Sequence, residues 1–256
     1  MGRILCSALV GTSSPDRQAS GQDRVEQLRD LEARIVDCRR CPRLVSWREQ
    51  VAVEKRAAFR DQTYWGRPVP GWGDPNAGLM VVGLAPAAHG ANRTGRMFTG
   101  DRSGDWLYAA LHRGGFANQP TSVDRDDGLV LHDVWITSPV KCAPPANKPT
   151  TTERDACRPF IDAELELLAD VRVVLALGAF GWAEAARVLG FDRRPTFGHG
   201  AEAVAPDGRV LIGSYHVSQQ NTFTGRLTET MLDAVIERSR ELIDTLRPDD
   251  DRHLRP

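Results

Sequence analysis

Residues 80–101 read Met-Val-Val-Gly-Leu-Ala-Pro-Ala-Ala-His-Gly-Ala-Asn-Arg-Thr-Gly-Arg-Met-Phe-Thr-Gly-Asp. The apolar start of this stretch predicts a buried strand, which Gly83 and Pro86 bring to an end. A long loop of small and polar residues follows, and the spacing after it predicts a helix over 103–114 with Ser103 as its N-cap. Strand-to-helix connections usually have ~2–6 residues, so this longer loop is typical of a ligand site. Open α/β sheets bind ligands at the carboxyl ends of their strands, which is where the loop lies.

Four apolar runs along the chain predict strands, and amphipathic segments between them predict helices. The strands are expected at 79–84, 133–138, 171–177 and 210–214, and the helices at 25–37, 103–114, 179–189 and 227–243, with a further helix capped by Thr151 or Thr152. Residues 43–60 fit either a helix or an irregular connector. Because strands that alternate with helices form parallel sheets covered on both faces, we predict a three-layer α/β/α sandwich with a central four-stranded parallel sheet.

The composition is that of an ordinary globular protein. The chain has 256 residues and a formal net charge of −1, so a nucleic-acid ligand would need a local basic patch rather than a general basic field. No apolar run is long enough to span a membrane, and the N-terminus lacks a signal-peptide cleavage pattern. We expect a cytoplasmic protein with one domain at 23–247, between a disordered leader at 1–22 and a charged tail at 248–256.

Four of the five cysteines form a pattern that could hold a metal centre. Cys38 and Cys41 are a Cys-x-x-Cys pair, and Cys142 and Cys157 come much later in the chain. An odd number of cysteines is poor evidence for a disulfide framework. Four thiolates could bind structural zinc or a [4Fe–4S] cluster, and the spacing leaves both open. Cys6, in the expected leader, is interpreted as a free thiol.

Two segments of the chain resemble the active-site motifs of family 5 (type B) uracil-DNA glycosylases. The first is Gly-Leu-Ala-Pro-Ala-Ala-His-Gly-Ala-Asn-Arg-Thr-Gly-Arg-Met-Phe-Thr-Gly-Asp, residues 83–101, and the second is His-Val-Ser-Gln-Gln-Asn-Thr-Phe-Thr-Gly-Arg, residues 216–226. The resemblance implies the fold of the uracil-DNA glycosylase superfamily and a [4Fe–4S] cluster on Cys38, Cys41, Cys142 and Cys157. It also implies a monofunctional enzyme that excises uracil, hypoxanthine and xanthine from DNA to start base-excision repair.

The resemblance further implies roles for individual residues. His216 would donate a hydrogen bond to the base as it leaves, and Asp101, assisted by Asn147, would orient the attacking water. The expected base-binding residues are Gly83, Leu84, Ala85, Ala87, Phe98 and Ser138, with the ring of Phe98 stacked on the flipped base. The expected DNA-binding residues are Arg93, Arg96, Arg102, Lys148, Gln219, Gln220, Asn221 and Arg226, and the loop at 218–223 would insert into the duplex.

Two positions bear on the chemistry and on the substrate range. Ala87 follows the Gly-x-x-Pro core of the first motif, where other families carry an Asp, Asn or Glu, so the acid must lie elsewhere and Asp101 is our choice. Many family 4 enzymes have an asparagine at the position of Ser138. A serine reads the base edge less strictly, which agrees with the wider substrate range that the resemblance implies.

Two other functions fit parts of the same pattern. The first is a non-catalytic or covalently trapping uracil-DNA-binding Fe–S protein of the same superfamily. The second is a nucleotide-binding α/β protein or an Fe–S module of a larger assembly, which gives Phe98, Asp101 and His216 no shared purpose. We expect a monomer whose partner is DNA that contains uracil or other deaminated bases, in the cytoplasm and associated with the nucleoid in a prokaryote.

Overall fold

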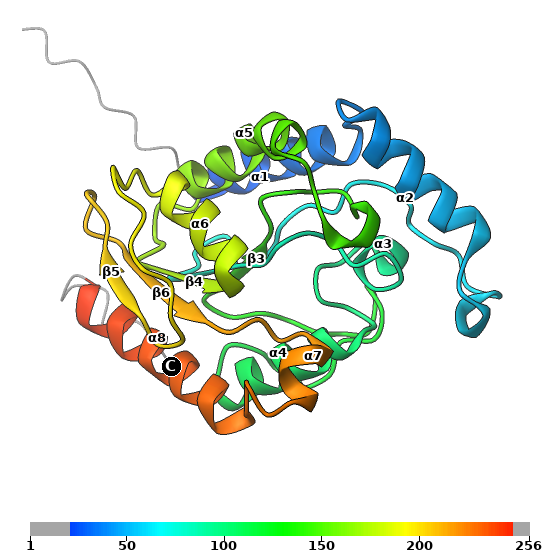
Figure 1. The fold of residues 1–256 in the computed structure, drawn as a ribbon. Coiled ribbons are helices and arrows are strands. Elements are labelled where there is room, and N and C mark those ends of the chain that lie inside the picture. Colours follow the sequence, from blue (N-terminus) through cyan, green and yellow to red (C-terminus); the bar gives the residue numbers. More distant parts are fainter. Residues whose placement is uncertain (1–20, 248–256) are drawn as a thin grey trace, which may run out of the picture.

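The computed structural model describes residues 21–247, and Figure 1 shows their arrangement. Most of the expected leader, with Cys6, and the expected charged tail at 248–256 lie outside the described residues. The first described helix, α1, spans Gly21–Val36, close to the predicted 25–37. Within residues 21–247 no helix is both long and apolar enough to cross a membrane.

One mixed sheet forms the centre of the fold, with its strands in the order β1-β3-β2-β4-β6-β5. The four central strands run parallel and are the four that the apolar runs predict. They are β3 (Val134–Thr137), β2 (Leu79–Val82), β4 (Val173–Leu177) and β6 (Val210–Ser214). The predicted strand number needs a correction, because β1 (Trp72–Gly73) and β5 (Glu202–Val204) add a short antiparallel strand at each edge. These edge strands are too short to give an apolar run.

Alternate residues of the strands pack against helices on opposite faces of the sheet. Leu79 and Val81 belong to an apolar core shared with residues of α4 (Arg102–Arg113) and α8 (Glu229–Leu246). Met80 and Val82 belong to a second core, shared with α1, α5 (Thr151–Leu167) and α6 (Gly178–Val188). Figure 1 shows the sheet between these two groups of helices, and the prediction of a three-layer α/β/α sandwich is confirmed.

Two helices begin earlier than the sequence predicts. Asp101, not Ser103, is the N-cap of α4, because Asp101 has the extended backbone that a cap requires and its side chain reaches two amides ahead. Thr150, not Thr151 or Thr152, caps α5 and forms a capping box with Glu153.

Residues 43–60, for which the sequence leaves two structures open, are mostly helical. Pro42 is the first residue of α2 (Pro42–Glu54), where its missing N–H costs nothing. A turn of 3₁₀-helix, η1 (Ala57–Phe59), follows. In Figure 1, α2 and the chain after it extend to one side of the sandwich, beside α3 (Ala91–Thr94).

Candidate active site

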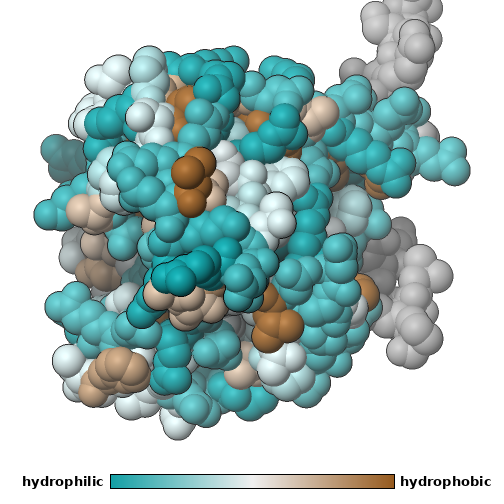
Figure 2. Space-filling model, turned by 90° about the vertical axis from the view of Figure 1, so that its right-hand side faces the viewer, coloured by the Kyte–Doolittle hydropathy of each residue, from teal (hydrophilic) through white to brown (hydrophobic). Residues whose placement is uncertain are grey.

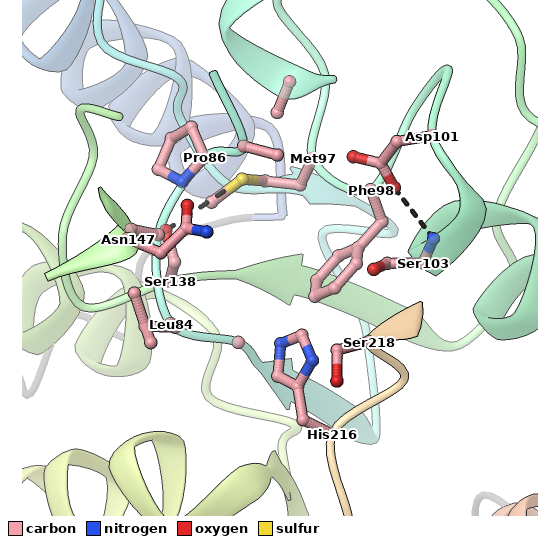
Figure 3. A pocket seen from close by; sticks show the side chains of 14 residues that line it. Leu84, Pro86, Met97, Phe98, Asp101, Ser103, Ser138, Asn147, His216 and Ser218 are labelled. Carbon is pink, nitrogen blue, oxygen red and sulfur yellow. Dashed lines mark hydrogen bonds between the residues drawn. The ribbon is translucent and has the colours of Figure 1, made fainter. Parts of the chain in front are cut away.

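A cavity of about 320 Å³ opens beyond the carboxyl ends of the parallel strands, and Figure 3 shows its lining. All nine residues that the sequence assigns to catalysis or base binding line it: Gly83, Leu84, Ala85, Ala87, Phe98, Asp101, Ser138, Asn147 and His216. Pro86, Ala91, Met97, Ser103 and Ser218 complete the lining and are not among the residues predicted for catalysis or base binding. The mixture of apolar walls with a few polar groups is typical of a site for a small organic molecule.

Phe98 forms one wall of the cavity and depends on Gly83 for its position. The ring centroids of Phe98 and His216 are 6.3 Å apart, and Figure 3 shows the two rings near each other on the cavity wall. Phe98 has a φ of 52°, in the left-handed region that non-glycine residues rarely adopt. A Cβ at position 83 would lie 2.8 Å from Cζ of Phe98. A glycine at the end of β2 therefore lets the ring approach the strand.

The two carboxylate oxygens of Asp101 have different surroundings: one accepts hydrogen bonds from a helix terminus, and the other does not. Its Oδ1 accepts hydrogen bonds from the backbone N–H groups of Ser103, at 2.9 Å, and Gly104, at 3.1 Å. Its Oδ2 makes no hydrogen bond to a described residue and lies so close to Gly90 that a Cβ there would be 1.9 Å away. Burial raises the pKa of Asp101, and the two amide donors oppose that rise. One side chain thus caps α4 and leaves an oxygen free for chemistry.

His216 follows β6 and presents a neutral imidazole to the cavity. Burial lowers the pKa of His216 to about 4, so the ring carries no charge at neutral pH. Its backbone carbonyl accepts a hydrogen bond of 2.8 Å from Nδ2 of Asn221, which holds this segment in place. The ring nitrogens have no hydrogen-bond partner among residues 21–247. A neutral imidazole keeps one N–H to donate to a ligand.

Ser138 and Asn147 lie on the same side of the cavity in Figure 3, opposite Phe98 and Asp101. Ser138, which follows β3, is fully buried and donates from Oγ to the carbonyl of Val140 at 2.9 Å. Its oxygen can still accept a hydrogen bond. Asn147 ends a 3₁₀ turn, η2 (Pro145–Asn147), with a φ of 54°, and its side chain is exposed.

The structure corrects two of the predicted DNA contacts, Arg93 and Arg96. Both are buried. Arg96 pairs with Asp127 at 2.7 Å, and its guanidinium also donates to two hydroxyl groups and a carbonyl. Arg93 donates to the carbonyls of two loop residues and to Oε1 of Gln62, at 2.6 Å. Both guanidinium groups donate to partners inside the protein, so we do not retain Arg93 and Arg96 as DNA contacts.

The other predicted DNA contacts are on the surface beside the cavity. Lys148, Arg102 and Arg226 are exposed and form no ion pair with a described carboxylate. The predicted insertion loop needs a correction, because residues 219–223 form a short helix, α7 (Gln219–Phe223). This helix exposes Gln219 and Gln220, with Asn221 partly covered, and ends in Phe223, whose side chain is 68% exposed.

A second, much smaller cavity brings together the four predicted ligand cysteines, Cys38, Cys41, Cys142 and Cys157. Nη1 of Arg48 donates to Sγ of Cys142 at 3.0 Å, and the backbone N–H of Lys141 donates to Sγ of Cys157 at 3.2 Å. Burial raises the pKa of Cys142 to about 11, against the influence of Arg48. Among residues 21–247, no group of three or more His, Cys, Asp or Glu side chains is arranged to hold a metal ion.

Comparison with known proteins gives a consistent set of relatives. The model of the uracil DNA glycosylase superfamily matches residues 70–240. The type-5 uracil-DNA glycosylase of Mycobacterium tuberculosis is 58% identical over 216 residues, which cover 83% of this chain and 81% of the relative. The type-5 uracil-DNA glycosylase of Thermus thermophilus is 52% identical over 211 residues, which cover 81% of this chain and 94% of the relative. A type-4 uracil-DNA glycosylase of Pyrobaculum aerophilum is 36% identical over 116 residues, or 45% of this chain and 51% of the relative.

Proposed function

Because the chain belongs to the type-5 uracil-DNA glycosylases of the uracil-DNA glycosylase superfamily, we propose that it is a monofunctional glycosylase that removes uracil, hypoxanthine and xanthine from DNA. The observation that carries the proposal is the convergence of all nine predicted catalytic and base-binding residues on one cavity. We also propose that the enzyme works as a monomer on DNA in the cytoplasm, associated with the nucleoid in a prokaryote.

The proposed reaction uses the two sides of the cavity for two tasks. The flipped base stacks on the ring of Phe98, and an N–H of the neutral His216 donates to a base oxygen that gains negative charge. Asp101, through its free Oδ2, accepts a proton from water while that water attacks C1′ of the sugar. The bond between C1′ and the base nitrogen breaks, its electron pair leaves with the base, and Asn147 helps to hold the water.

The proposed range of bases rests on the polar groups near the base edge. The hydroxyl of Ser138 is held by the carbonyl of Val140, and its oxygen accepts from whichever donor a base presents. Ala85 and Ala87, which also line the cavity, make no hydrogen-bonding demand with their side chains. A site discriminates between bases by hydrogen bonding when a wrong base leaves its buried polar groups unpaired. A site with few fixed polar groups therefore excludes few bases.

Base release from matched duplexes tests this function. We expect the purified protein to release free uracil, hypoxanthine and xanthine from duplexes that are otherwise identical, measured by chromatography of the freed base. The Asp101→Asn variant serves as the control. Binding without release from any of the three duplexes would contradict the enzymatic function, and a covalent adduct would favour a trapping protein. Release of uracil alone would contradict only the wider range.

We propose that the four cysteines hold a [4Fe–4S] cluster, and the surroundings of the sulfur atoms fit that group. Arg48 is 1% exposed, and its Nε has no hydrogen-bond partner. Its ion pair with Glu49 spans 3.9 Å, and the Glu49 side chain is 44% exposed. Because a buried cation with only one long, partly exposed ion pair is costly, an anionic group on the cysteine sulfurs would stabilise Arg48.

The proposed role of the cluster is structural. When bound, it would supply iron–thiolate bonds that join the start of α2, the loop after β3 and α5. Ala85 of the base cavity packs against the apolar group that contains Cys142. Nδ2 of Asn92 in the first motif donates to the carbonyl of Arg48 at 3.2 Å. We expect Cys41→Ser to lose visible absorption, iron and soluble protein together. A folded, active, iron-free Cys41→Ser protein would contradict the structural role.

A further inference from the structure

A groove of about 880 Å³ runs over the mouth of the base cavity. The two share Ala87, Asp101, Ser103, Asn147 and Ser218, so the cavity opens into the floor of the groove. One wall carries Gln219 and Gln220 of α7, from the second motif. The opposite wall carries residues of the segment 56–62, which belongs to neither motif and which the sequence does not single out. We call this segment the outer wall.

The outer wall is fastened to the first motif at two points. Arg93 lies over the ring of Phe59, 4.0 Å from its centroid, and donates to Oε1 of Gln62 at 2.6 Å. The hydroxyl of Tyr64 is 3.1 Å from Nδ1 of His89 and also accepts from the backbone N–H of Arg56, at 3.3 Å. Arg93 therefore holds the outer wall in a fixed position relative to the floor of the groove.

The charge of the outer wall comes from Arg56. Its side chain lines the groove, is exposed and forms no ion pair with a described carboxylate. Arg102, at the start of α4, is the other exposed arginine in the lining. Of the acidic lining residues, Asp101 uses its Oδ1 in the cap of α4 and Asp105 is exposed. Because Arg102 lies over the ring of Phe223 in α7, 5.2 Å from its centroid, the groove has one exposed cation on the α7 wall and one, Arg56, on the outer wall.

The surface around the outer wall is polar. Figure 2 shows the face toward which α2 and the outer wall extend, and it is mostly hydrophilic with small, separate hydrophobic spots. Such a face suits a sugar–phosphate backbone better than an apolar partner. A groove with a cation on each wall and a base cavity in its floor matches a strand whose middle base is flipped inward.

We propose that the outer wall is a second DNA-binding element, in which Arg56 contacts a phosphate of the damaged strand next to the flipped nucleotide. This inference rests on the proposed function, because it takes damaged DNA as the ligand of the groove. It assigns Arg93 the task of positioning the outer wall, in place of direct contact with DNA. A strand held from both walls is fixed on both sides of the base that must enter the cavity.

The salt dependence of DNA binding tests the proposal. The probe is a fluorescent duplex with a tetrahydrofuran abasic-site analogue, which binds without chemistry, and its Kd is measured across a range of salt concentrations. Each phosphate contact adds about 0.9 to the slope of log Kd against log salt. We expect Arg56→Gln to lower this slope by about 0.9, so that its loss of affinity shrinks about 3.5-fold between roughly 50 and 200 mM salt.

Arg193→Gln is the matched control, because Arg193 is exposed, has no ion pair with a described carboxylate and does not line the groove. It removes the same charge and should leave the slope unchanged. An Arg56→Gln slope equal to that of Arg193→Gln would overturn the proposal. Single-turnover uracil release is measured separately. Wild-type protein that binds the probe but releases no uracil would defeat the proposed function and leave the slope test intact.

Discussion

Asp101 has a structural task and a proposed chemical task, and two substitutions separate them. Its Oδ1 caps α4 through the amides of Ser103 and Gly104, and its Oδ2 is free at the cavity. Asparagine caps helices about as well as aspartate, whereas alanine cannot cap. Neither residue can take a proton from water. Asp101→Asn therefore removes the proposed base and keeps the cap, and Asp101→Ala removes both.

The expected magnitudes follow from these contacts. Asp101→Asn should change the free energy of unfolding by less than about 0.5 kcal/mol, and Asp101→Ala should lower it by about 1 kcal/mol. Both should slow base release by about 10²–10⁴-fold, the usual contribution of a positioned base. Urea denaturation measures the first quantity, and single-turnover release of uracil at saturating protein measures the second.

The pH dependence provides an independent check on the same carboxylate. Burial raises the pKa of Asp101, so its base form is lost as the pH falls through a value above the ~3.9 of an exposed aspartate. The rate should fall on that acid limb, and the limb should be absent in Asp101→Asn. The free energy of unfolding should depend on pH in the opposite direction to the rate. Because the folded-state pKa of Asp101 is raised, this residue contributes stability at low pH, and that contribution is lost as the pH rises through the raised pKa. A wild-type rate in Asp101→Asn would refute the assignment and leave Asp101 as a cap alone.

Three further substitutions test other parts of the structure. His216→Gln should slow uracil release by about 10²–10³-fold and keep the wild-type pH profile above about pH 5, because the pKa of His216 is already about 4; a lost acid limb would contradict this. Ser138→Asn should lower hypoxanthine release relative to uracil release in a competition assay, and an unchanged ratio would count against the role of Ser138. Lys141→Met should lower the free energy of unfolding by about 3–5 kcal/mol in urea denaturation, because it leaves Glu164, 2.8 Å from Lys141 and just as buried, without its cation. Adding Glu164→Leu should restore much of the loss, and a double variant no more stable than Lys141→Met would contradict this.

The central sheet and the cavity could be predicted because their signals are local. Each parallel strand is a continuous apolar run, and polar or glycine-rich segments follow at the end where ligands bind. The edge strands β1 and β5 could not be predicted in this way, because two or three residues are too few to show the alternation or the apolar run of a strand. The cap at Asp101 was missed for a related reason: Ser103 is an equally good cap by residue type, and only the backbone conformation decides between them.

The sequence could not show whether an arginine side chain points into the protein or toward the solvent. Arg96 and Arg102 lie close together in the same motif, yet Arg96 is 5% exposed and paired with Asp127, while Arg102 is on the surface. A guanidinium serves equally well for an internal carboxylate and for a phosphate. Arg56 was overlooked because a cation after an amphipathic helix usually indicates only a solvated surface. Its place in the groove depends on contacts between segments distant in sequence.

The backbone of Phe98 has a consequence for any attempt to make the protein more heat-resistant. A residue other than glycine in the left-handed region costs about 1–2 kcal/mol, so Phe98→Gly would relax the loop at its φ of 52°. The same change would remove the aromatic wall of the cavity. Strain relief alone would not make this variant more heat-resistant, because the ring of Phe98 packs against the main apolar core and glycine loses that packing, at a cost of about 3–5 kcal/mol. The ring of Phe98 thus lines the cavity and, through its packing on the core, helps to hold the loop in its left-handed conformation.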